Sequence, residues 1–218
     1  KDDIIIDGGN SHYDDTERRY SYLKEKNINF IGAGVSGGSK GARFGPSIMP
    51  GGDKDSYEIV KPIFESVSAK VKGEPCVTYL GNTSSGHYVK MIHNGIEYGI
   101  MQLISESYHI LKNGLNKENI EIHNTFKKWN DGMLNSYLVE ITRDVFKVKD
   151  EKSDNYLIDL ILDKAKQKGT GKWTSQSAMD FGVSIPTIDS SVSMRIISSF
   201  KETRVKAQKL YSKKIISS

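Results

Sequence analysis

The sequence predicts an α/β segment followed by an all-helical segment, and a change of pattern near Asn82 is the main observation behind this prediction. Before Asn82, three short apolar runs alternate with two helix-like stretches, which is the spacing expected of βαβ units and a parallel sheet. After it, helical periodicity continues with no strand pattern between the helices. We therefore expect two domains, residues 1–82 and residues 83–218.

The α/β segment opens on residues 3–7 (DIIID), a β-branched run that ends directly in Gly8, Gly9 and Asn10. Such a run is typical of a buried parallel strand with a functional loop at its carboxyl end. Three strands and two helices make only half of a doubly wound sheet, so we expect another βαβ half to precede them. The other elements predicted here are a helix over 14–27, a strand over 29–35, a helix over 53–66 and a strand over 76–80.

The all-helical segment is predicted from 3.6-residue periodicity and from the glycines and polar residues that interrupt it. Its first helix is unusually long and ends before Gly114. The predicted helices cover residues 84–111, 117–129, 134–147, 155–168 and 188–211.

Composition narrows the classes of function. Of the 218 residues, 37% are hydrophobic and 27% are charged, an ordinary balance for a globular protein. No apolar run approaches the ~20 residues of a membrane span, and the first residues do not form a secretory signal. The net charge of +4 is not gathered into a basic patch with interleaved aromatics, which argues against nucleic-acid binding. The single cysteine, Cys76, excludes an internal disulfide framework and fits a reducing, cytoplasmic compartment.

A glycine motif follows the second predicted strand. Gly32, Gly34 and Gly37 spell G-x-G-x-x-G, the pattern of a pyrophosphate-binding loop. That fingerprint requires a helix after the loop, and the glycines and proline within residues 38–46 predict that none begins there. We therefore expect a loop whose backbone approaches a ligand closely, with a hydroxyl from Ser36, although a glycine-rich surface loop is an even alternative.

The long helix carries the most specific chemistry. Five polar residues follow i, i+3, i+4, i+7, i+8 spacing and therefore share one face: Lys90, His93, Asn94, Glu97 and Tyr98. Apolar residues on the other faces predict a helix that is buried nearly all round. A desolvated lysine has a depressed pKa and can act as a general base, and a glutamate two turns away can serve as a second acid. The alternative is that Lys90 and Glu97 are simply ion-paired to other elements.

Two later segments contribute cations. Residues 168–172 (KGTGK) predict a basic, glycine-rich loop that suits a phosphate. Arg195 lies among small and apolar residues, where a guanidinium needs a partner such as phosphate. Each cation on its own is more often a surface residue than a ligand.

Taken together, these segments resemble the 6-phosphogluconate dehydrogenase family. The shared motifs occur in family order and span almost the whole chain: DGGN (7–10), GVSGG (34–38), GARFGPSIMPGG (41–52), GHYVKMIHNGIEYG (86–99), KGTGKWT (168–174) and the region around Arg195. The resemblance implies that residues 1–82 are the C-terminal part of a Rossmann-like NADP-binding domain. It also implies that residues 83–218 are the N-terminal part of the family's helical domain.

The resemblance also implies a reaction and a set of site residues. The family oxidises 6-phosphogluconate with NADP and decarboxylates the 3-keto acid to ribulose 5-phosphate, as a homodimer. Lys90 would then be the base and acid at the 3-hydroxyl, and Glu97 the acid that protonates C1. Substrate-contacting positions would be Asn10, Ser36, Gly37, Gly38, His93 and Asn94, with Asn10 also touching the cofactor. The phosphate site would be Tyr98, Lys168 and Arg195, and no metal is implied.

The chain lacks two features of the family pattern: a pyrophosphate fingerprint before Asn10 and a C-terminal tail. We therefore expect the 218-residue chain alone neither to bind NADP tightly nor to turn over. Two alternatives remain open. One is a related β-hydroxyacid dehydrogenase that acts on a smaller acid without a phosphate, and the other is a non-catalytic interaction module.

Overall fold

The computed structural model describes residues 3–211 of the chain, and the chain divides into two compact units, Lys1–Asn94 and Gly95–Ser218. The division falls inside the long helix α4, Ser85–His109, which begins just after the change of sequence pattern near Asn82. The α/β and all-helical segments therefore differ in architecture as the sequence predicts, and α4 continues from the first unit into the second.

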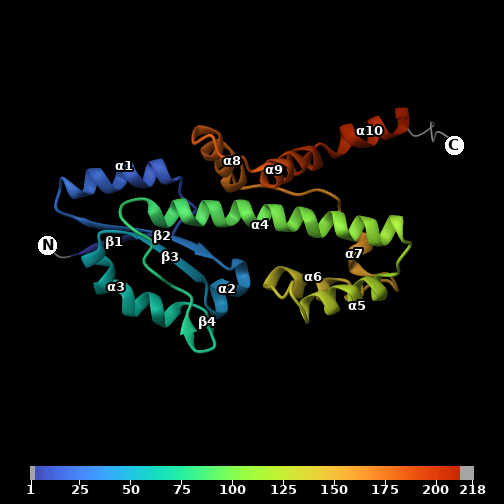
Figure 1. Cartoon of the computed structure of the whole chain (residues 1–218), viewed down its shortest axis with the longest axis horizontal. Coiled ribbons are helices and arrows are strands. Elements are labelled where there is room, and N and C mark those ends of the chain that lie inside the picture. The colour runs from blue at the N-terminus through green and yellow to red at the C-terminus, as the bar shows by residue number, and fades with distance from the viewer. Residues whose placement is uncertain (1–2, 212–218) are drawn as a thin grey trace. The chain divides into compact units, whose positions relative to one another are not determined.

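The first unit holds a three-stranded sheet, three helices, a two-stranded ribbon and the first turns of α4 (Figure 1). Its elements are β1 (Ile4–Asp7), α1 (Tyr13–Lys24), β2 (Asn29–Ser36), α2 (Gly38–Phe44), β3 (Ser47–Gly52), α3 (Lys54–Val67), β4 (Lys70–Val71) and β5 (Glu74–Pro75).

The sheet has the order β1-β2-β3, and its two faces are covered differently. Side chains alternate between the faces of a strand. Ile31 and Ala33 of β2 join a buried cluster with Tyr57, Val60 and Phe64 of α3. The intervening Gly32 and Gly34 face α1 and the first turns of α4 (Figure 1). The glycines thus mark the face on which the long helix lies.

The strands differ from the predicted sheet in direction and in burial. β1 and β2 are parallel, as predicted, but β3 runs antiparallel to β2. The short connection through α2 explains this, because a parallel return needs a crossover of a dozen or more residues. The prediction that β1 is buried is wrong: it is an edge strand, and Ile5 and Ile6 are 44% and 39% exposed.

The prediction of a third strand over residues 76–80 is wrong. These residues run beside β3 with one isolated parallel bridge, between Ile48 and Val77. Ile48 donates to Cys76 and Leu80 donates to Pro50, at 2.9 and 3.0 Å. Pro50 accepts the second of these bonds through its carbonyl oxygen but has no N–H to donate, so a regular ladder cannot form.

The glycine-rich segment after β2 does begin a helix, contrary to the sequence prediction. α2 spans seven residues and begins at Gly38, directly after Gly37; the φ angles of Gly37 and Gly38 are +147° and +57°. These positive φ angles make the sharp turn from strand to helix, and they favour glycine. Local helix propensity was therefore a poor guide here, because the turn and the surrounding contacts decide the conformation.

The second unit is helical. After the remaining turns of α4, its elements are η1 (Ile110–Gly114, a π-helix), α5 (Asn119–Asn130), α6 (Tyr137–Val145), α7 (Leu157–Leu160), α8 (Thr170–Asp180), α9 (Pro186–Ser199) and α10 (Lys201–Tyr211). A buried cluster of Ile122, Phe126, Val139 and Phe146 holds α5 and α6 together, and Tyr108 of α4 stacks on Phe146 at 5.2 Å between ring centroids.

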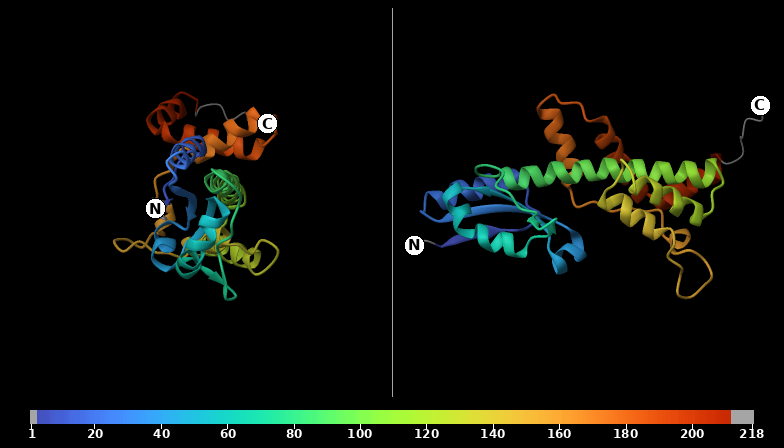
Figure 2. Two further views of the ribbon diagram at one scale, coloured as in Figure 1. Left: turned by 90° about the vertical axis from the view of Figure 1, so that its left-hand side faces the viewer. Right: turned by 60° about the horizontal axis from the view of Figure 1, so that its bottom comes forward.

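Three helix predictions in this unit need correction. The predicted helix over 155–168 is reduced to the four residues of α7, and Figure 2 shows an extended loop between α6 and α7. The predicted helix over 188–211 is two helices, interrupted at Phe200. α8 begins at Thr170, inside the segment predicted as a phosphate loop, because Gly169 turns the chain at φ +103°.

The long helix is not buried nearly all round, as its apolar content had suggested. Val89, Ile96, Ile100 and Leu103 are between 37% and 53% exposed. No helix of residues 3–211 is long and apolar enough to cross a membrane.

Candidate active site

The first turns of α4 lie unusually close to the sheet because four glycines remove side chains from the contact. A Cβ on Gly34 would lie 2.3 Å from Cβ of Lys90, and one on Gly86 would lie 2.3 Å from the carbonyl oxygens of Gly32 and Met49. A Cβ on Gly51 would lie 2.4 Å from the Gly86 nitrogen. Real Cβ atoms do not approach so closely, so backbone packing fixes the start of α4 on the strands.

This packing explains the glycine motif differently from a pyrophosphate loop. Gly32 and Gly34 lie inside β2, and only Gly37 stands at the turn after it. The first two glycines therefore accommodate α4 and not a phosphate. The prediction that the motif is not a dinucleotide fingerprint agrees with this placement, although a helix does follow it.

Lys90 is buried, with 8% of its surface exposed, and its ammonium donates a hydrogen bond to the side-chain oxygen of Asn10. Asn10 follows β1, and Ser36 ends the neighbouring parallel strand β2. The carboxyl ends of parallel strands meet at one edge of a sheet, where open α/β folds bind ligands. Ser36 also shares a strand face with Gly34, on which the Lys90 stem lies. The structure thus gathers Asn10, Ser36 and Lys90 in the first unit.

The other residues predicted to contact the substrate lie at the end of β2 and on α4. Gly37 and Gly38 form the exposed turn directly after Ser36. His93 and Asn94 are half-buried on α4 one turn beyond Lys90, with 3.3 Å between the His93 Nδ1 and the Asn94 Oδ1. They offer nitrogen and oxygen atoms that can form hydrogen bonds with hydroxyl and carboxylate groups.

Sequence reasoning missed a buried polar group beside the lysine. His87 is 1% exposed, and its Nδ1 lies 2.7 Å from the Thr16 hydroxyl. Burial lowers the pKa of His87 below its ordinary value, and the nearby Lys90 ammonium acts in the same direction against the opposing Asp7 carboxylate. Its place three residues before Lys90 was the available signal, since i and i+3 share a helix face.

In the second unit, a cation lies on an aromatic ring. Tyr98 is 8% exposed, and the Arg195 guanidinium carbon lies 3.9 Å from its ring centroid. A Cβ on Gly171 of α8 would lie 2.5 Å from the Tyr98 ring. Tyr98 and Arg195 line a cavity of about 530 Å³. The structure therefore brings together two of the three residues predicted for a phosphate.

Arg195 does not depend on a phosphate for its contacts. Its Nη1 donates to the Lys166 carbonyl oxygen at 2.8 Å, and its Nη2 lies 3.6 Å from the Met101 sulfur. Lys168 is exposed just before α8, and no contact of its side chain with Tyr98 or Arg195 is found in residues 3–211. Glu97 is half-buried on α4, next to Tyr98.

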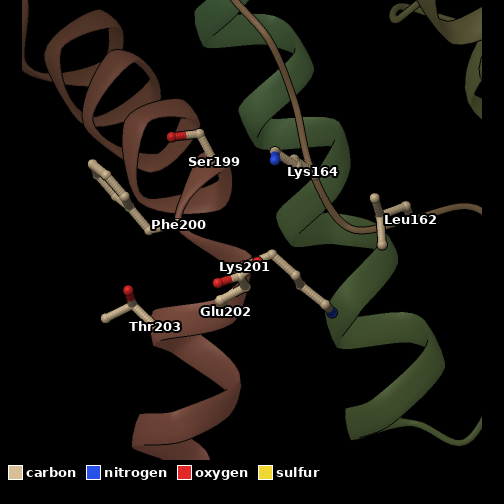
Figure 3. A pocket seen from close by; sticks show the side chains of 7 residues that line it. All are labelled: Leu162, Lys164, Ser199, Phe200, Lys201, Glu202 and Thr203. Carbon is tan, nitrogen blue, oxygen red and sulfur yellow. The ribbon is translucent and has the colours of Figure 1, made fainter.

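A smaller cavity of about 380 Å³ lies where α9 meets α10, lined by Lys164, Phe200 and Lys201 among others (Figure 3). Beside it, the Asp163 carboxylate accepts hydrogen bonds from Lys201 and, at 2.7 Å, from Arg204. These two partners lower the pKa of Asp163 to about 2. Asp163 and Arg204 line the larger cavity together with Tyr98 and Arg195. Lys201 and Arg204 are thus committed to Asp163, whereas Arg195 donates to a backbone carbonyl oxygen.

No cluster of three or more His, Cys, Asp or Glu side chains suited to a metal ion occurs among the described residues. Asn10 is exposed at the carboxyl end of β1, so its amide can reach a cofactor bound at this edge while its oxygen accepts from Lys90. The donor set at this edge fits an organic cofactor and substrate.

An α/β unit that joins a helical unit through a lysine-bearing helix defines the class of two-domain dehydrogenases. Residues 1–81 match the NAD binding domain of 6-phosphogluconate dehydrogenase, and residues 86–217 match the 6-phosphogluconate dehydrogenase C-terminal domain. The chain belongs to the 6-phosphogluconate dehydrogenase family.

Individual relatives agree with this assignment. The NADP(+)-dependent, decarboxylating 6-phosphogluconate dehydrogenase of Bacillus subtilis is 63% identical over 97% of this chain. The decarboxylating enzyme of Lactococcus lactis (strain IL1403) is 58% identical over the same share. The chain spans 45% of the length of each of these relatives.

Solved structures show the same fold. The 6-phosphogluconate dehydrogenase of Plasmodium falciparum, described as apo and in complexes with NADP+ and with 6-phosphogluconate, matches all of this chain and 47% of its own, with a TM-score of 0.93 and 53% identity. A 3-hydroxyisobutyrate dehydrogenase from Salmonella typhimurium covers 88% of this chain and 62% of its own, with a TM-score of 0.66 and 16% identity. The second likeness concerns the fold alone.

Proposed function

We propose that this chain carries the catalytic lysine and part of the substrate site of an NADP-dependent, decarboxylating 6-phosphogluconate dehydrogenase. The reaction converts 6-phosphogluconate to ribulose 5-phosphate and carbon dioxide. The observation that carries this proposal is the buried Lys90, seated on Gly34 and bonded to Asn10 at the carboxyl edge of β1 and β2. The names and bound molecules of the relatives supply the substrate and cofactor.

Lys90 serves as the proton carrier. Removal from water favours the neutral form of an amine, and a neutral Lys90 can accept the proton of the 3-hydroxyl. NADP supplies the hydride acceptor for that oxidation. The resulting ammonium then donates a proton to the C3 oxygen as the carboxylate is lost as carbon dioxide, so the proton count at Lys90 closes. The Asn10 amide holds the amine in place between these steps.

Glu97 and the phosphate-binding residues lie further along α4. Glu97 is seven residues beyond Lys90, about 10 Å of helical rise, which suits protonation at C1 of the enediol. Tyr98 and Arg195 bind the phosphate, with Lys168 as a second cation. Asn10, Ser36, Gly37, Gly38, His93 and Asn94 contact the remainder of the sugar acid.

The surrounding assignments belong to the same proposal. Residues 1–82 contribute to the NADP-binding domain, and residues 83–218 contribute to the helical domain. The complete enzyme works as a homodimer in the cytoplasm, and the 218-residue chain alone is inactive because it spans less than half of its relatives' length.

The second candidate is a β-hydroxyacid dehydrogenase that acts on a smaller, unphosphorylated acid. Its structural likeness is limited to the fold. Arg195 stacked on Tyr98 at the edge of a cavity favours the phosphorylated substrate, because a guanidinium binds phosphate oxygens through paired N–H donors. A purely non-catalytic interaction module would not explain why Lys90 is buried and bonded to Asn10.

The test compares two substrates with the complete gene product that includes this chain. We expect NADP reduction and carbon dioxide release with 6-phosphogluconate, and a much larger KM with gluconate. Equal kcat/KM for the two acids would overturn the phosphate assignment, and no turnover of either acid would overturn the reaction. The 218-residue chain is assayed beside it and is expected to show no turnover.

A further inference from the structure

His87 is a fully buried polar side chain of α4 that the proposed reaction does not use. Its ring lies on β2 at Gly32, where a Cβ would come within 3.1 Å of Nδ1. The Thr16 hydroxyl of α1 reaches the same nitrogen at 2.7 Å. Three elements therefore meet at one imidazole, one helical turn before Lys90.

The charges around His87 keep it neutral at pH 7. Burial is the largest effect and lowers its pKa, and the Lys90 ammonium lowers it as well. The Asp7 carboxylate at the end of β1 raises it, but Asp7 is shared with Arg19 of α1 at 3.4 Å. Gly32 of β2 lies against the ring and adds no charge.

The hydrogen bonds are consistent with one neutral form. The Thr16 hydroxyl has a single proton and lies 3.1 Å from the His12 carbonyl oxygen. If it donates there, it accepts from an Nδ1–H of His87, and both contacts are satisfied. The other ring nitrogen, Nε2, is buried and makes no hydrogen bond of good geometry among residues 3–211. The backbone at Ala33 and Asp7 raises the pKa of the ring, against the larger opposing effect of burial.

We propose that neutral His87 is a positioning residue for Lys90. The imidazole fills the space above Gly32 and ties α4 to Thr16, which fixes the rotation of the first turns of α4 about the helix axis. Residues i and i+3 share a helix face, so this rotation decides where the Lys90 amine lies relative to Asn10. The importance of His87 for catalysis rests on the proposed role of Lys90. The effect of His87 on the position of the Lys90 side chain does not depend on that role.

A histidine that only packs the core predicts a different outcome. Its loss would lower stability and leave the surroundings of Lys90 unchanged in the folded protein. A positioning residue changes the reactivity of the lysine it holds, even in variants that fold. The accessibility of Lys90 to a small acylating reagent is therefore the deciding readout.

The first measurement is the protonation form of His87 in the 15N-histidine-labelled 218-residue chain. We expect NMR shifts of one neutral form, with the proton on Nδ1, across pH 6.5–8. A ring that exchanges between both neutral forms, or that is charged at pH 7, would overturn the proposal.

The second measurement is the acylation rate of Lys90 by acetic anhydride, read by peptide mass spectrometry against the exposed Lys152 as internal reference. His87→Leu removes the polar contact, and Thr16→Val removes it from the other side. Both are expected to raise the relative rate at Lys90 at least threefold. The matched variants His87→Asn, which keeps a polar atom near the Nδ1 position, and Thr16→Ser, which keeps the hydroxyl, are expected to restore the original rate.

An unchanged Lys90 rate in folded His87→Leu and Thr16→Val would refute the positioning role. If His87→Leu does not fold, the comparison of Thr16→Val with Thr16→Ser is sufficient to test the positioning role. Neither measurement uses a sugar acid or NADP, so failure of the proposed reaction leaves these results interpretable. In the complete gene product, the same two variants are expected to lower kcat more than they change KM.

Discussion

The two parts of α4 are held by different kinds of contact. In the first unit, its opening turns lie directly on backbone, and added Cβ atoms at Gly34, Gly51 or Gly86 would come within 2.4 Å of other atoms. In the second unit, the helix meets α8 and α9 through side chains such as Tyr98, whose ring contacts Gly171 and Arg195.

This difference bears on what each part can do. Backbone contacts without intervening side chains have few alternative arrangements, so the strands limit the positions that the start of α4 can adopt. A guanidinium on a long side chain can move by rotamer changes, so Arg195 can adjust to an anion. The end of α4 that carries Lys90 is thus rigid, and the cation near Tyr98 is adaptable.

The largest effect is expected from Lys90→Met in the complete gene product. The apolar stem of methionine fills the space on Gly34, but no amine remains to carry the proton. Loss of a general base typically costs about 10²–10⁴-fold in rate, and we expect a fall of kcat in that range with little change in KM. The measurement is steady-state NADP reduction with 6-phosphogluconate.

The control for this change is Lys152→Met, which removes an exposed lysine from the loop after α6. It is expected to leave kcat unchanged. A Lys90→Met enzyme with near-normal kcat would show that the rigid end of α4 does not carry the chemistry, and the comparison between the two parts would lose its functional meaning.

Gly34→Ala tests the rigidity itself. The new methyl group would overlap Cβ of Lys90 at 2.3 Å and the Gly86 carbonyl oxygen at 2.9 Å. Because backbone must move, we expect a loss of about 3 kcal/mol in the free energy of unfolding, at the upper end of usual overpacking costs. Denaturant unfolding of the 218-residue chain measures it.

Gly8→Ala is the matched control, since its Cβ would meet nothing closer than 3.9 Å. We expect it to change stability by less than about 0.5 kcal/mol. If both alanines cost the same, the close approach of α4 to β2 is not a constraint on stability.

Much of the fold followed from sequence patterns where periodicity is long. The helices α1, α3, α4 and α5 were predicted within a few residues, and so were the strand β2 and the parallel pairing of β1. The errors fall where tertiary contacts decide. Gly38 and Gly169 are poor helix residues by propensity, yet α2 and α8 begin beside them because positive φ at Gly37 and Gly169 turns the chain.

The candidate site shows the same limit. Helical spacing was enough to place Lys90 and Tyr98 on one face, and both are buried. Spacing could not show that Gly32 and Gly34 serve α4, because that contact joins residues more than 50 positions apart. It also could not find Thr16, whose partner His87 lies 71 residues away.

Arg195→Lys tests the adaptable end. Lysine keeps the positive charge but loses the planar fork and the stacking on Tyr98. In the complete gene product, we expect KM for 6-phosphogluconate to rise about tenfold with kcat nearly unchanged, as for loss of one charge-assisted hydrogen bond.

Gluconate provides the internal control, because it has no phosphate to lose contact with. An equal rise of KM for both acids would assign Arg195 a structural role in α9. A fall of kcat without a change of KM would mean that the cation takes part in the chemistry at the other end of α4.

The smallest effect is a pH dependence of stability that belongs to the rigid part alone. Burial keeps the folded-state pKa of His87 below its ordinary value of 6.5. Below pH 6.5 the unfolded chain therefore binds a proton that the folded chain does not. The stability contributed by neutral His87 is complete above pH 6.5 and is lost as the pH falls toward the folded-state pKa.

In that window, the slope of the free energy of unfolding due to His87 can reach at most about 1.4 kcal/mol per pH unit. Asp7 stays ionised throughout it, because its pKa is lowered from an ordinary value of 3.8 despite the opposing effect of burial. Denaturant unfolding from pH 8 to pH 5 should give a shallower slope for His87→Asn than for the parent chain. His109→Asn, at an exposed position of α4, should keep the parent slope. Equal slopes for all three chains would mean that the pKa of His87 is the same in the folded and the unfolded chain.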